Sequence, residues 1–287
     1  MAKVALDIGG FSIIRRIGTG ARSTIYLATD RQDKIEVALK RVIFERPEDS
    51  RIFEQVDTEY KVAGRIDHPY IRKCYKLKKV RSMFVVKEML LSMELFDGKS
   101  LEDSPALSLL DVLLVFRMVA SGLQAMHQQG FVHCDIKPNN ILINDTGTIK
   151  IIDLGQSCKI GTIKPRIQGT PDYIAPEQVR RKSLGPKTDI FNLGATMYWA
   201  ITGKHAPTLI AKKNSLGLPL PPQPRMAPHE LRKQLPVEIS KLVMDCIEDE
   251  PAKRPRDMTT VISRLDLLVH SILAGQIKTD KDASNNN

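Results

Sequence analysis

Three side chains with complementary chemistry lie close together in the segment His-Cys-Asp-Ile-Lys-Pro-Asn-Asn of residues 133–140. Asp135 can accept a proton, Lys137 can neutralise a phosphate, and Asn140 offers an amide oxygen to a metal ion. A second carboxylate, Asp153, follows two short strand patterns and opens the sequence Asp-Leu-Gly. Because phosphoryl transfer needs groups of these types, this part of the chain predicts a phosphotransferase site.

A glycine-rich stretch lies near the N-terminus, between two strand patterns, and reads Gly-Thr-Gly-Ala-Arg-Ser-Thr-Ile over residues 18–25. Glycines let backbone N–H groups approach phosphate oxygens without interference from side chains. An ordinary tight hairpin explains the same residues when the stretch is taken alone. A strand rather than a helix follows, so the stretch does not indicate a Rossmann dinucleotide fold.

A lysine and a glutamate of the N-terminal region form a second candidate pair. Lys40 ends the apolar strand pattern Val-Ala-Leu-Lys, where its stem can be buried and its ammonium can reach a phosphate. Glu59, on a helix expected over residues 51–65, can restrain that ammonium if the helix packs on the strand. When Lys40 and Glu59 are considered separately, each can also be an ordinary solvated surface residue.

Apolar periodicity predicts the elements that must position these residues. Strand patterns cover 11–17, 24–28, 35–41, 74–80 and 84–93, and the helix 51–65 interrupts them. Beyond residue 98 the pattern becomes mainly helical, with an apolar stripe over 108–128. A hairpin of strands 141–143 and 149–152 is the exception, with Asn-Asp-Thr-Gly as its turn. The fold class is therefore α+β, a small β-sheet part with one helix followed by a larger helical part.

Two segments near the C-terminus do not suit regular elements. Seven prolines fall within residues 204–236 and predict an extended surface loop. The stretch 219–224 within it is explained as a variable loop or, alternatively, as a polyproline docking segment. The polar tail 273–287 is expected to be disordered.

Composition narrows the class of protein. The chain of 287 residues is 42% apolar and 26% charged, which excludes disordered, collagenous and disulfide-rich classes. Its net charge of +10 favours anionic partners without choosing among them. The four cysteines lie far apart without zinc-ligand spacing, so a reducing compartment is expected. Charged residues interrupt the apolar stretches, so we expect neither a signal peptide nor a membrane span, and a cytoplasmic location.

Taken in order, these motifs make the chain similar to the eukaryotic-like (Hanks-type) serine/threonine protein kinases. The resemblance covers residues 11 to about 272. Besides the motifs above, it rests on Gly-Thr-Pro-Asp-Tyr-Ile-Ala-Pro-Glu at 169–177, on Asp-Ile-Phe-Asn-Leu-Gly at 189–194, and on Arg254. It implies a bilobal fold with an N-lobe of about 11–93, a hinge of about 94–98 and a C-lobe of about 99–272.

The same resemblance implies the cofactors and the roles of the site residues. ATP and Mg²⁺ are the expected cofactors, and a protein with a serine or threonine acceptor is the expected substrate. Asp135 and Lys137 are implied as catalytic residues, and Asn140 and Asp153 as metal ligands, all converging with Lys40 on the terminal phosphate in one cleft. Met93 is expected beside the adenine. The implied nucleotide-binding residues are Ile17, Gly18, Thr19, Gly20, Ser23, Ile25, Ala38, Lys40, Glu59, Met93, Glu94, Phe96 and Leu142.

Further residues of the pattern are implied to support residues 133–140, the catalytic loop of the family, and to set the class of hydroxyl that accepts the phosphate. Asp189 is expected to accept backbone hydrogen bonds from the loop, and Glu177 to pair with Arg254. Lys137, two residues after Asp135, and Thr170, ahead of the Ala-Pro-Glu motif, resemble serine/threonine rather than tyrosine kinases. Phosphoserine or phosphothreonine is therefore the expected product.

Three positions depart from the commonest text of the family: Ser23 replaces a glycine, Leu154 a phenylalanine, and Cys134 an arginine. That arginine normally receives a phosphorylated residue of the activation loop, and a thiol offers no cation. We therefore expect activity without phosphorylation between Cys158 and Gln168, although three cations of that segment could bind a phosphate locally. Cys134 and Cys158 are either inert thiols or redox-active ones.

Two questions stay open at the level of sequence. Six cations fall within residues 72–81, and they form either a solvated strand face or a docking surface for an acidic partner, with nucleic acid not expected. An active kinase is the expected function. A catalytically silent, nucleotide-binding scaffold is the alternative, whereas the segment ending at Glu177 disfavours a small-molecule phosphotransferase.

Overall fold

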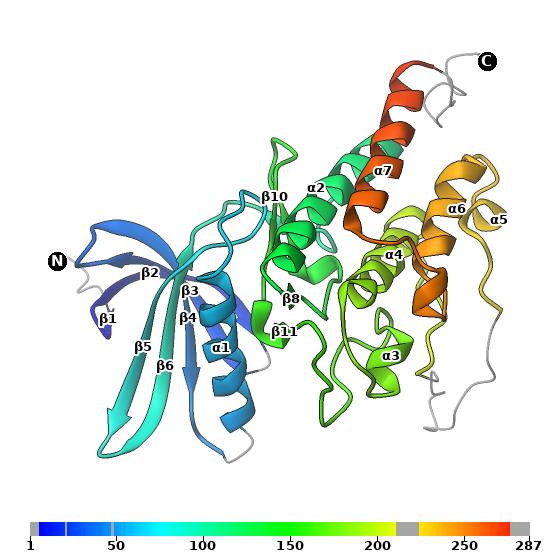
Figure 1. The fold of residues 1–287 in the computed structure, drawn as a ribbon. Coiled ribbons are helices and arrows are strands. Elements are labelled where there is room, and N and C mark those ends of the chain that lie inside the picture. Colours follow the sequence, from blue (N-terminus) through cyan, green and yellow to red (C-terminus); the bar gives the residue numbers. More distant parts are fainter. Residues whose placement is uncertain (1–5, 21, 47–48, 211–223, 276–287) are drawn as a thin grey trace, which may run out of the picture. The chain divides into compact units, whose positions relative to one another are not determined.

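The computed structural model describes residues 6–20, 22–46, 49–210 and 224–275. The chain divides into two compact units. The N-terminal unit comprises the residues up to Asp97 together with Ile152–Gln156, and the C-terminal unit comprises Gly98–Ile151 and the residues from Ser157 onward. Figure 1 labels the elements of both units.

The N-terminal unit is built on one antiparallel six-stranded sheet in the order β1-β2-β3-β4-β6-β5 (Figure 1). The five strands expected from the sequence are present, and a short strand precedes them. Helix α1 (Ser50–Ala63) confirms the expected helix. The strands are β1 (Asp7–Ile8), β2 (Phe11–Gly20), β3 (Ser23–Asp30), β4 (Ile35–Ile43), β5 (Cys74–Ser82) and β6 (Val85–Glu94).

Alternation along β4 distributes its side chains between two apolar clusters. Val37 and Leu39 belong to the cluster that includes Phe11, Ala28 and Leu90. Ala38 and Val42 belong to the other cluster, which includes residues Phe53 and Val56 of α1. Because side chains two residues apart share a face of a strand, Lys40 lies on the α1 side of the sheet. The alternation thus directs the ammonium toward the helix that carries Glu59.

The C-terminal unit is mainly helical, as expected. Its helices are α2 (Leu109–Gln128), α3 (Pro176–Val179), α4 (Pro186–Thr202), α5 (Pro228–Leu231), α6 (Val237–Cys246) and α7 (Met258–Leu273). Its strands are β7 (Lys99–Ser100), β8 (Phe131–Val132), β9 (Ile141–Ile143), β10 (Ile149–Ile151) and β11 (Cys158–Lys159). Single 3-10 turns are η2 (Pro138–Asn140) and η4 (Pro251–Lys253), and η3 (Leu154–Gln156) belongs to the N-terminal unit. β9 and β10 pair as the expected antiparallel hairpin.

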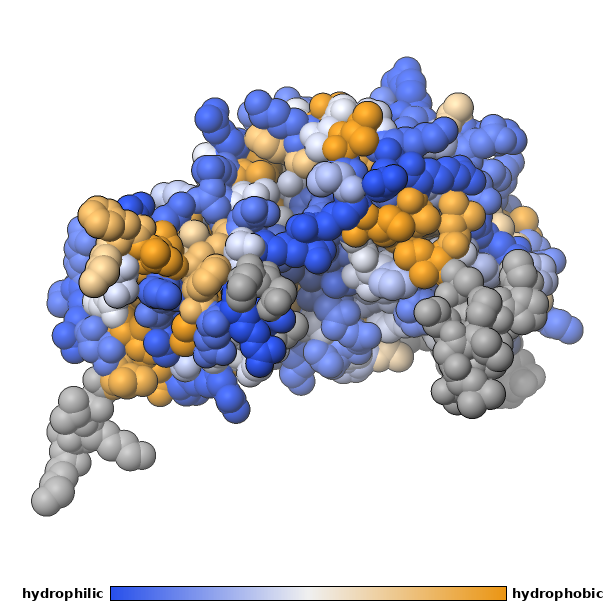
Figure 2. All heavy atoms as spheres, turned by 90° about the horizontal axis from the view of Figure 1, so that it is seen from below, coloured by the Kyte–Doolittle hydropathy of each residue, from blue (hydrophilic) through white to orange (hydrophobic). Residues whose placement is uncertain are grey.

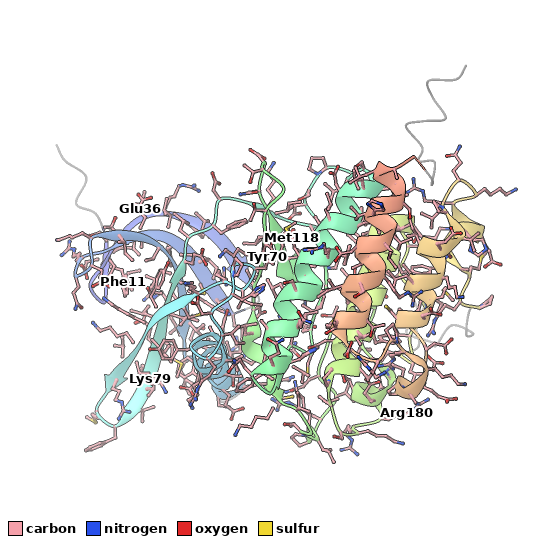
Figure 3. The ribbon with its side chains drawn as sticks, turned by 45° about the horizontal axis from the view of Figure 1, so that its top comes forward. Phe11, Glu36, Tyr70, Lys79, Met118 and Arg180 are labelled. Atoms are coloured by element: carbon pink, nitrogen blue, oxygen red, sulfur yellow. The ribbon has the colours of Figure 1, made fainter. Side chains whose placement is uncertain are left out.

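Helix α2 is the central helix of this unit. It contacts α4 and α7, and α2 and α7 lie side by side in Figures 1 and 3. By length and composition alone, it is the one helix of the described residues that could cross a membrane. Half of its most apolar stretch is buried within the structure, and Val115, Phe116, Val119 and Leu123 are almost fully enclosed. This packing is that of a core helix.

Glycine permits one close helix contact in this unit. A Cβ atom on Gly194 of α4 would come within 2.5 Å of the Cβ atom of Cys246 of α6. Since real Cβ atoms do not approach backbone-fixed atoms so closely, a larger residue would force the two helices apart.

One expectation from the sequence needs correction. Residues 228–231 form the short helix α5 within the stretch expected to be an extended loop, because Pro228 occupies the first helical turn, where its missing N–H costs nothing. Glu94, the first residue of the expected hinge, is the last residue of β6, and its N–H donates to the Lys73 carbonyl oxygen at 2.9 Å. The expectations for 219–223 and for the tail beyond residue 275 lie outside the described residues.

On the face that Figure 2 shows, most of the coloured side chains are hydrophilic, and apolar side chains gather in places. Among the described residues, Met83 and Phe84 are the most exposed large apolar side chains, at 93% and 95%. They form the turn between β5 and β6. Ile160, Ile163 and Ile167, which follow β11, are also exposed.

Candidate active site

The N-terminal unit brings Lys40, Glu59 and Asp153 together. Lys40 Nζ donates a hydrogen bond of 2.7 Å to Glu59 Oε2 and lies 3.9 Å from Asp153 Oδ1. The Glu59 side chain is only 2% exposed, whereas that of Asp153 is 45% exposed. Burial lowers the pKa of Lys40, but the charges of Glu59 and Asp153 outweigh burial and raise it above its ordinary value. The ammonium is therefore charged and held in one position.

Arg72 is a further cation beside the same glutamate. Its Nη2 atom lies 3.5 Å from Glu59 Oε1, and its side chain is 12% exposed. Glu59 thus has a cation near each of its two carboxylate oxygens. This contact could not be predicted from the sequence, because Arg72 precedes β5 and its proximity to α1 is a tertiary feature.

The backbone around Asp153 explains how its carboxylate reaches Lys40. Asp153 has a positive φ of 61°, and the turn η3 follows it and packs against α1. A Cβ atom on Gly155 would lie 3.0 Å from Gln55 Cβ and 3.2 Å from the Gln55 carbonyl oxygen. Glycine at position 155 therefore allows the close approach of this segment to the helix.

The glycine-rich stretch forms the hairpin between β2 and β3. Gly18 pairs with Ile25 and Gly20 with Ser23, so both glycines lie on the ladder rather than in an open loop. A Cβ atom on Gly20 would come within 2.6 Å of Ser23 Oγ. The expected nucleotide residues in this hairpin are Ile17, Gly18, Thr19, Gly20, Ser23 and Ile25.

The apolar nucleotide residues lie in several places. Ala38 and Met93 are buried in one cluster, and Ile25 packs against it. Met93 pairs with Ala38 across β4 and β6. Glu94 ends β6, half-buried Phe96 follows it, and Leu142 lies on β9 of the C-terminal unit.

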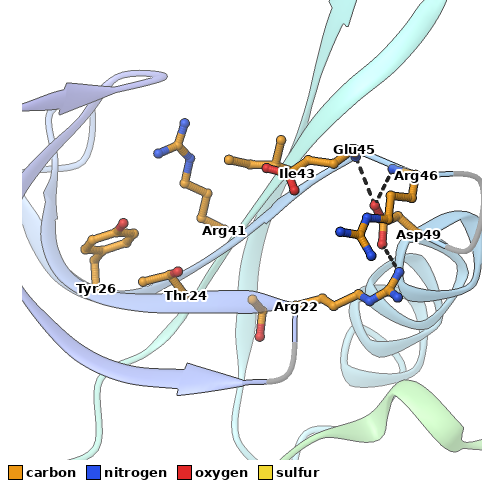
Figure 4. Close-up of a pocket in the computed structure, with 9 residues that line it drawn as sticks. Arg22, Thr24, Tyr26, Arg41, Ile43, Glu45, Arg46 and Asp49 are labelled. Atoms are coloured by element: carbon orange, nitrogen blue, oxygen red, sulfur yellow. Dashed lines mark hydrogen bonds and ion pairs between the residues drawn. The ribbon is translucent and has the colours of Figure 1, made fainter.

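A separate pocket of about 430 Å³ lies at one end of the β3–β4 pair (Figure 4). Its lining includes three arginines, but Asp49 binds the guanidinium of Arg22, and Arg41 binds Glu88. Asp49 also accepts hydrogen bonds from the backbone N–H groups of Glu45 and Arg46, at 2.9 and 2.7 Å. Of the expected nucleotide residues, its described lining contains Ser23 alone, so this pocket is not the expected ATP site.

The C-terminal unit brings Asp135, Lys137 and Asn140 together. Lys137 Nζ lies 3.2 Å from Asp135 Oδ2. Asn140 Nδ2 donates to the Asp135 carbonyl oxygen at 2.8 Å and to Oδ2 at 3.3 Å. The three residues therefore form one cluster around a carboxylate that is 3% exposed.

Thr170 completes this cluster. Its backbone N–H and its Oγ1 both donate to Asp135 Oδ1, at 3.1 and 2.9 Å. Lys137 Nζ in turn donates to Thr170 Oγ1 at 2.8 Å. The sequence identified Thr170 only as a marker of hydroxyl class, and the structure shows that it orients the carboxylate directly.

A buried aspartate organises the backbone of the catalytic loop, as expected. Asp189 accepts hydrogen bonds from the N–H groups of His133 and Cys134, at 2.9 and 2.8 Å. Burial raises the pKa of Asp189, but the hydrogen bond with His127 and these further contacts outweigh it and hold the pKa below its ordinary value. Gln178, which the sequence did not identify, donates to the Cys134 carbonyl oxygen at 2.8 Å.

The expected ion pair between Glu177 and Arg254 is confirmed. Arg254 Nη1 and Nη2 donate to the two Glu177 oxygens at 2.8 and 3.0 Å, and the Arg254 side chain is fully enclosed. Thr188 Oγ1 also donates to Glu177, at 2.9 Å. This bidentate pair anchors α3 to the segment that precedes α7.

The basic segment 72–81 is largely neutralised within the N-terminal unit. Five of its cations contact an oxygen of the same unit, and Figure 3 shows one of them, Lys79, on β5. The partners of Arg72, Lys73, Lys76, Lys78 and Lys79 are Glu59, Asp67, Asp30 with Asp33, the Gly9 carbonyl and Asp57, respectively. This pairing favours the interpretation of segment 72–81 as a solvated strand face over its interpretation as a docking surface.

Comparison with known protein families identifies the family of the chain. The model of the protein kinase domain matches residues 11–264. The chain therefore belongs to the protein kinase family.

Several curated bacterial proteins are similar to the chain. A probable serine/threonine-protein kinase of Clostridium acetobutylicum is 27% identical over 89% of the chain and 39% of its own length. Serine/threonine-protein kinase PknA of Mycobacterium tuberculosis is 29% identical over 81% of the chain and 57% of its length. Serine/threonine-protein kinase PrkC of Bacillus subtilis is 30% identical over 68% and 31%, respectively. The chain thus spans less than two thirds of each of these relatives.

Proposed function

We propose that this chain transfers the γ-phosphoryl group of ATP to serine or threonine hydroxyls of protein substrates. The cluster around Asp135 is the main support for this proposal. Its carboxylate is held by Thr170, Lys137 and Asn140, all within 3.3 Å. A carboxylate fixed in this way can accept or orient the proton of an attacking hydroxyl, with an ammonium beside it to offset phosphate charge.

The Lys40 cluster suits the positioning of the nucleotide. Lys40 is a fixed ammonium, because Glu59 binds it at 2.7 Å and is itself buried. An ammonium held at one point can bind the α- and β-phosphates and align the leaving group. We assign the contacts with the nucleotide to Lys40 and to the hairpin of residues 17–25.

The donor set of the chain fits a magnesium ion. Asn140 and Asp153 offer amide and carboxylate oxygens, which Mg²⁺ prefers over nitrogen or sulfur ligands. Among the described residues, no group of three or more His, Cys, Asp or Glu side chains could hold a metal ion by itself. By the family resemblance, we assign Asn140 and Asp153 as metal ligands, with nucleotide phosphates supplying further oxygens. When bound, the ion neutralises charge that develops on the phosphate oxygens.

Substrate class and location extend the proposal. The curated relatives named above carry the description serine/threonine-protein kinase, which supports hydroxyl acceptors in proteins. All four cysteines are free thiols, which supports a cytoplasmic location. An acidic docking partner on the segment 72–81 remains the weaker proposal, since it would have to displace pairs such as Lys76 with Asp30.

The test is incubation of the full chain with Mg²⁺, labelled ATP and a general protein acceptor, followed by phosphoamino acid analysis. We expect label on phosphoserine or phosphothreonine. Phosphotyrosine as the dominant product would contradict the hydroxyl class. Binding of ATP without any transfer of label would favour the alternative, a silent nucleotide-binding scaffold.

A further inference from the structure

Two cysteines of the C-terminal unit lie in contact although they are far apart in sequence. The Sγ atom of Cys134, in the catalytic loop, is 3.8 Å from the Sγ atom of Cys158, the first residue of β11. The short strands β8 and β11 pair in antiparallel register, with Cys158 opposite Val132. This pairing places Cys158 beside the loop that follows β8.

The surroundings of the pair are largely apolar and asymmetric. Val132, Cys134 and Leu184 form a small buried cluster against which Cys158 packs. Cys134 is fully buried, whereas Cys158 is half-buried. Among the described residues, no other cysteine sulfur lies within hydrogen-bonding distance of these two sulfurs.

The backbone of Cys134 is fixed on both sides of its side chain. Its N–H donates to Asp189, and its carbonyl oxygen accepts from Gln178, both at 2.8 Å. Its φ of 68° lies in the left-handed region. These contacts fix the backbone of Cys134 while its sulfur lies 3.8 Å from that of Cys158, so a bond between the two sulfurs needs them to approach by about 2 Å.

We propose that Cys134 and Cys158 are a redox modification site that closes to an intramolecular disulfide when a hydroperoxide oxidises the chain. The proposal is independent of the proposed kinase activity, because it concerns the two sulfurs alone. A transient disulfide of this kind is compatible with a reducing compartment, where disulfides serve catalysis or redox sensing.

The pKa values of the two thiols differ, and this difference decides which sulfur reacts first with the hydroperoxide. The hydrogen bond from Cys134 lowers the pKa of Cys158 to about 7, despite its burial, and Lys164 adds to the lowering. The hydrogen bond with Cys158 and burial raise the pKa of Cys134 well above its ordinary value. The Cys158 thiolate is therefore the nucleophile toward peroxide, and Cys134 is the resolving thiol.

The disulfide forms in two steps, in which atoms and electrons balance. In the first, the Cys158 thiolate attacks one peroxide oxygen, the O–O bond breaks, and hydroxide leaves and takes up a proton to become water. The product is the Cys158 sulfenic acid. In the second, the Cys134 thiol loses its proton and attacks the Cys158 sulfur, the S–O bond breaks, and a second water leaves. Two thiols are oxidised to one disulfide while hydrogen peroxide is reduced to two waters.

The bond would join the start of the segment 158–168 to the catalytic loop, one residue before Asp135. It replaces a contact between two sulfurs by a covalent link across β8 and β11. We expect amide hydrogen exchange in residues 157–160 to slow on oxidation and to return to its former rate on reduction.

The experiment uses the reduced full chain, treated with hydrogen peroxide, quenched with a maleimide and analysed by intact mass and peptide mapping. We expect a 134–158 cross-linked peptide, two fewer maleimide groups, and recovery of both thiols with a dithiol reductant. Cys158→Ser should abolish the cross-link, and Cys74→Ser, a matched control at a half-buried cysteine, should leave it intact.

Two results would overturn the proposal. One is oxidation of Cys158 to sulfinic or sulfonic acid while Cys134 still takes up maleimide, because the pair would then fail to resolve. The other is full uptake of maleimide by both Cys134 and Cys158 in the unfolded chain after treatment with excess hydrogen peroxide, because no disulfide would then have formed. Both measurements use the unaltered chain, so they hold even if a serine variant fails to fold.

Discussion

The guanidinium of Arg72 lies 3.5 Å from the carboxylate of Glu59. Glu59 is also the partner of Lys40, so two cations share one carboxylate that is 2% exposed. A buried charge without a partner is strongly destabilising. The second cation means that Glu59 retains a partner even when Lys40 is removed.

This relationship predicts a non-additive effect on stability. Lys40→Met and Arg72→Met should each lower the free energy of unfolding only modestly, because the other cation remains beside Glu59. The double variant should lose about 3 to 5 kcal/mol. Urea unfolding measures all three, and the same cycle with Glu59→Gln as background should remove the coupling. Additive losses in the original background would contradict the shared pairing.

The buried pair of Glu177 and Arg254 predicts a loss of stability. Arg254→Ala leaves the Glu177 carboxylate, which is 6% exposed, without its bidentate partner. The free energy of unfolding should fall by about 3 to 5 kcal/mol. Arg256→Ala is the matched control, since that side chain is 85% exposed and should change stability little. Equal denaturation midpoints for Arg254→Ala and the unaltered chain would be inconsistent with the pair's role.

Thr170 predicts a change in turnover rather than in nucleotide binding. Its hydroxyl donates to Asp135 and accepts from Lys137. Loss of a hydrogen bond to a charged group, worth about 1.5 to 3 kcal/mol, should lower kcat by roughly 10- to 100-fold in Thr170→Ala. Steady-state kinetics should show a KM for ATP that changes little, and Thr170→Ser should recover most of kcat. Equal loss in both variants would argue against the hydroxyl.

Because Cys134 offers no cation to a phosphate, we expect activity that does not depend on phosphorylation in residues 158–168. Cys134 contributes no cation at its position in the catalytic loop, and the nearest functional group to its sulfur is another thiol. Thr162 in that segment donates its hydroxyl to the Lys159 carbonyl oxygen at 2.7 Å. Treatment with a phosphatase should therefore leave the rate of phosphoryl transfer within about twofold. A large loss of rate would show that a phosphate binds elsewhere, for example to Lys164.

Much of the fold was predictable because its signals are local. The strands around Lys40 and the helix that carries Glu59 follow from periodicities of two and 3.6 residues, which burial enforces. Helix α5 was missed because proline excludes the interior of a helix but suits its first turn. The grouping of Asp135, Lys137 and Asn140 was predictable because the three residues lie in one short segment.

The remaining features depend on contacts between residues distant in sequence. The pairing of Arg72 with Glu59 and of Lys76 with Asp30 could not be read from a run of cations. The contact between Cys134 and Cys158 depends on β8 and β11, strands of two residues that are too short to produce a pattern. These are the places where tertiary structure adds most to the sequence.

In the proposed function, Asp135 carries phosphoryl transfer whereas Lys40 positions the nucleotide. The decisive measurement compares ATP affinity and label transfer for the unaltered chain, Asp135→Asn and Lys40→Met. We expect Asp135→Asn to bind MgATP within about twofold of the unaltered chain while transfer falls by at least about 100-fold. Lys40→Met should also lose transfer. Undiminished incorporation of label by Asp135→Asn would show that this carboxylate does not carry the transfer.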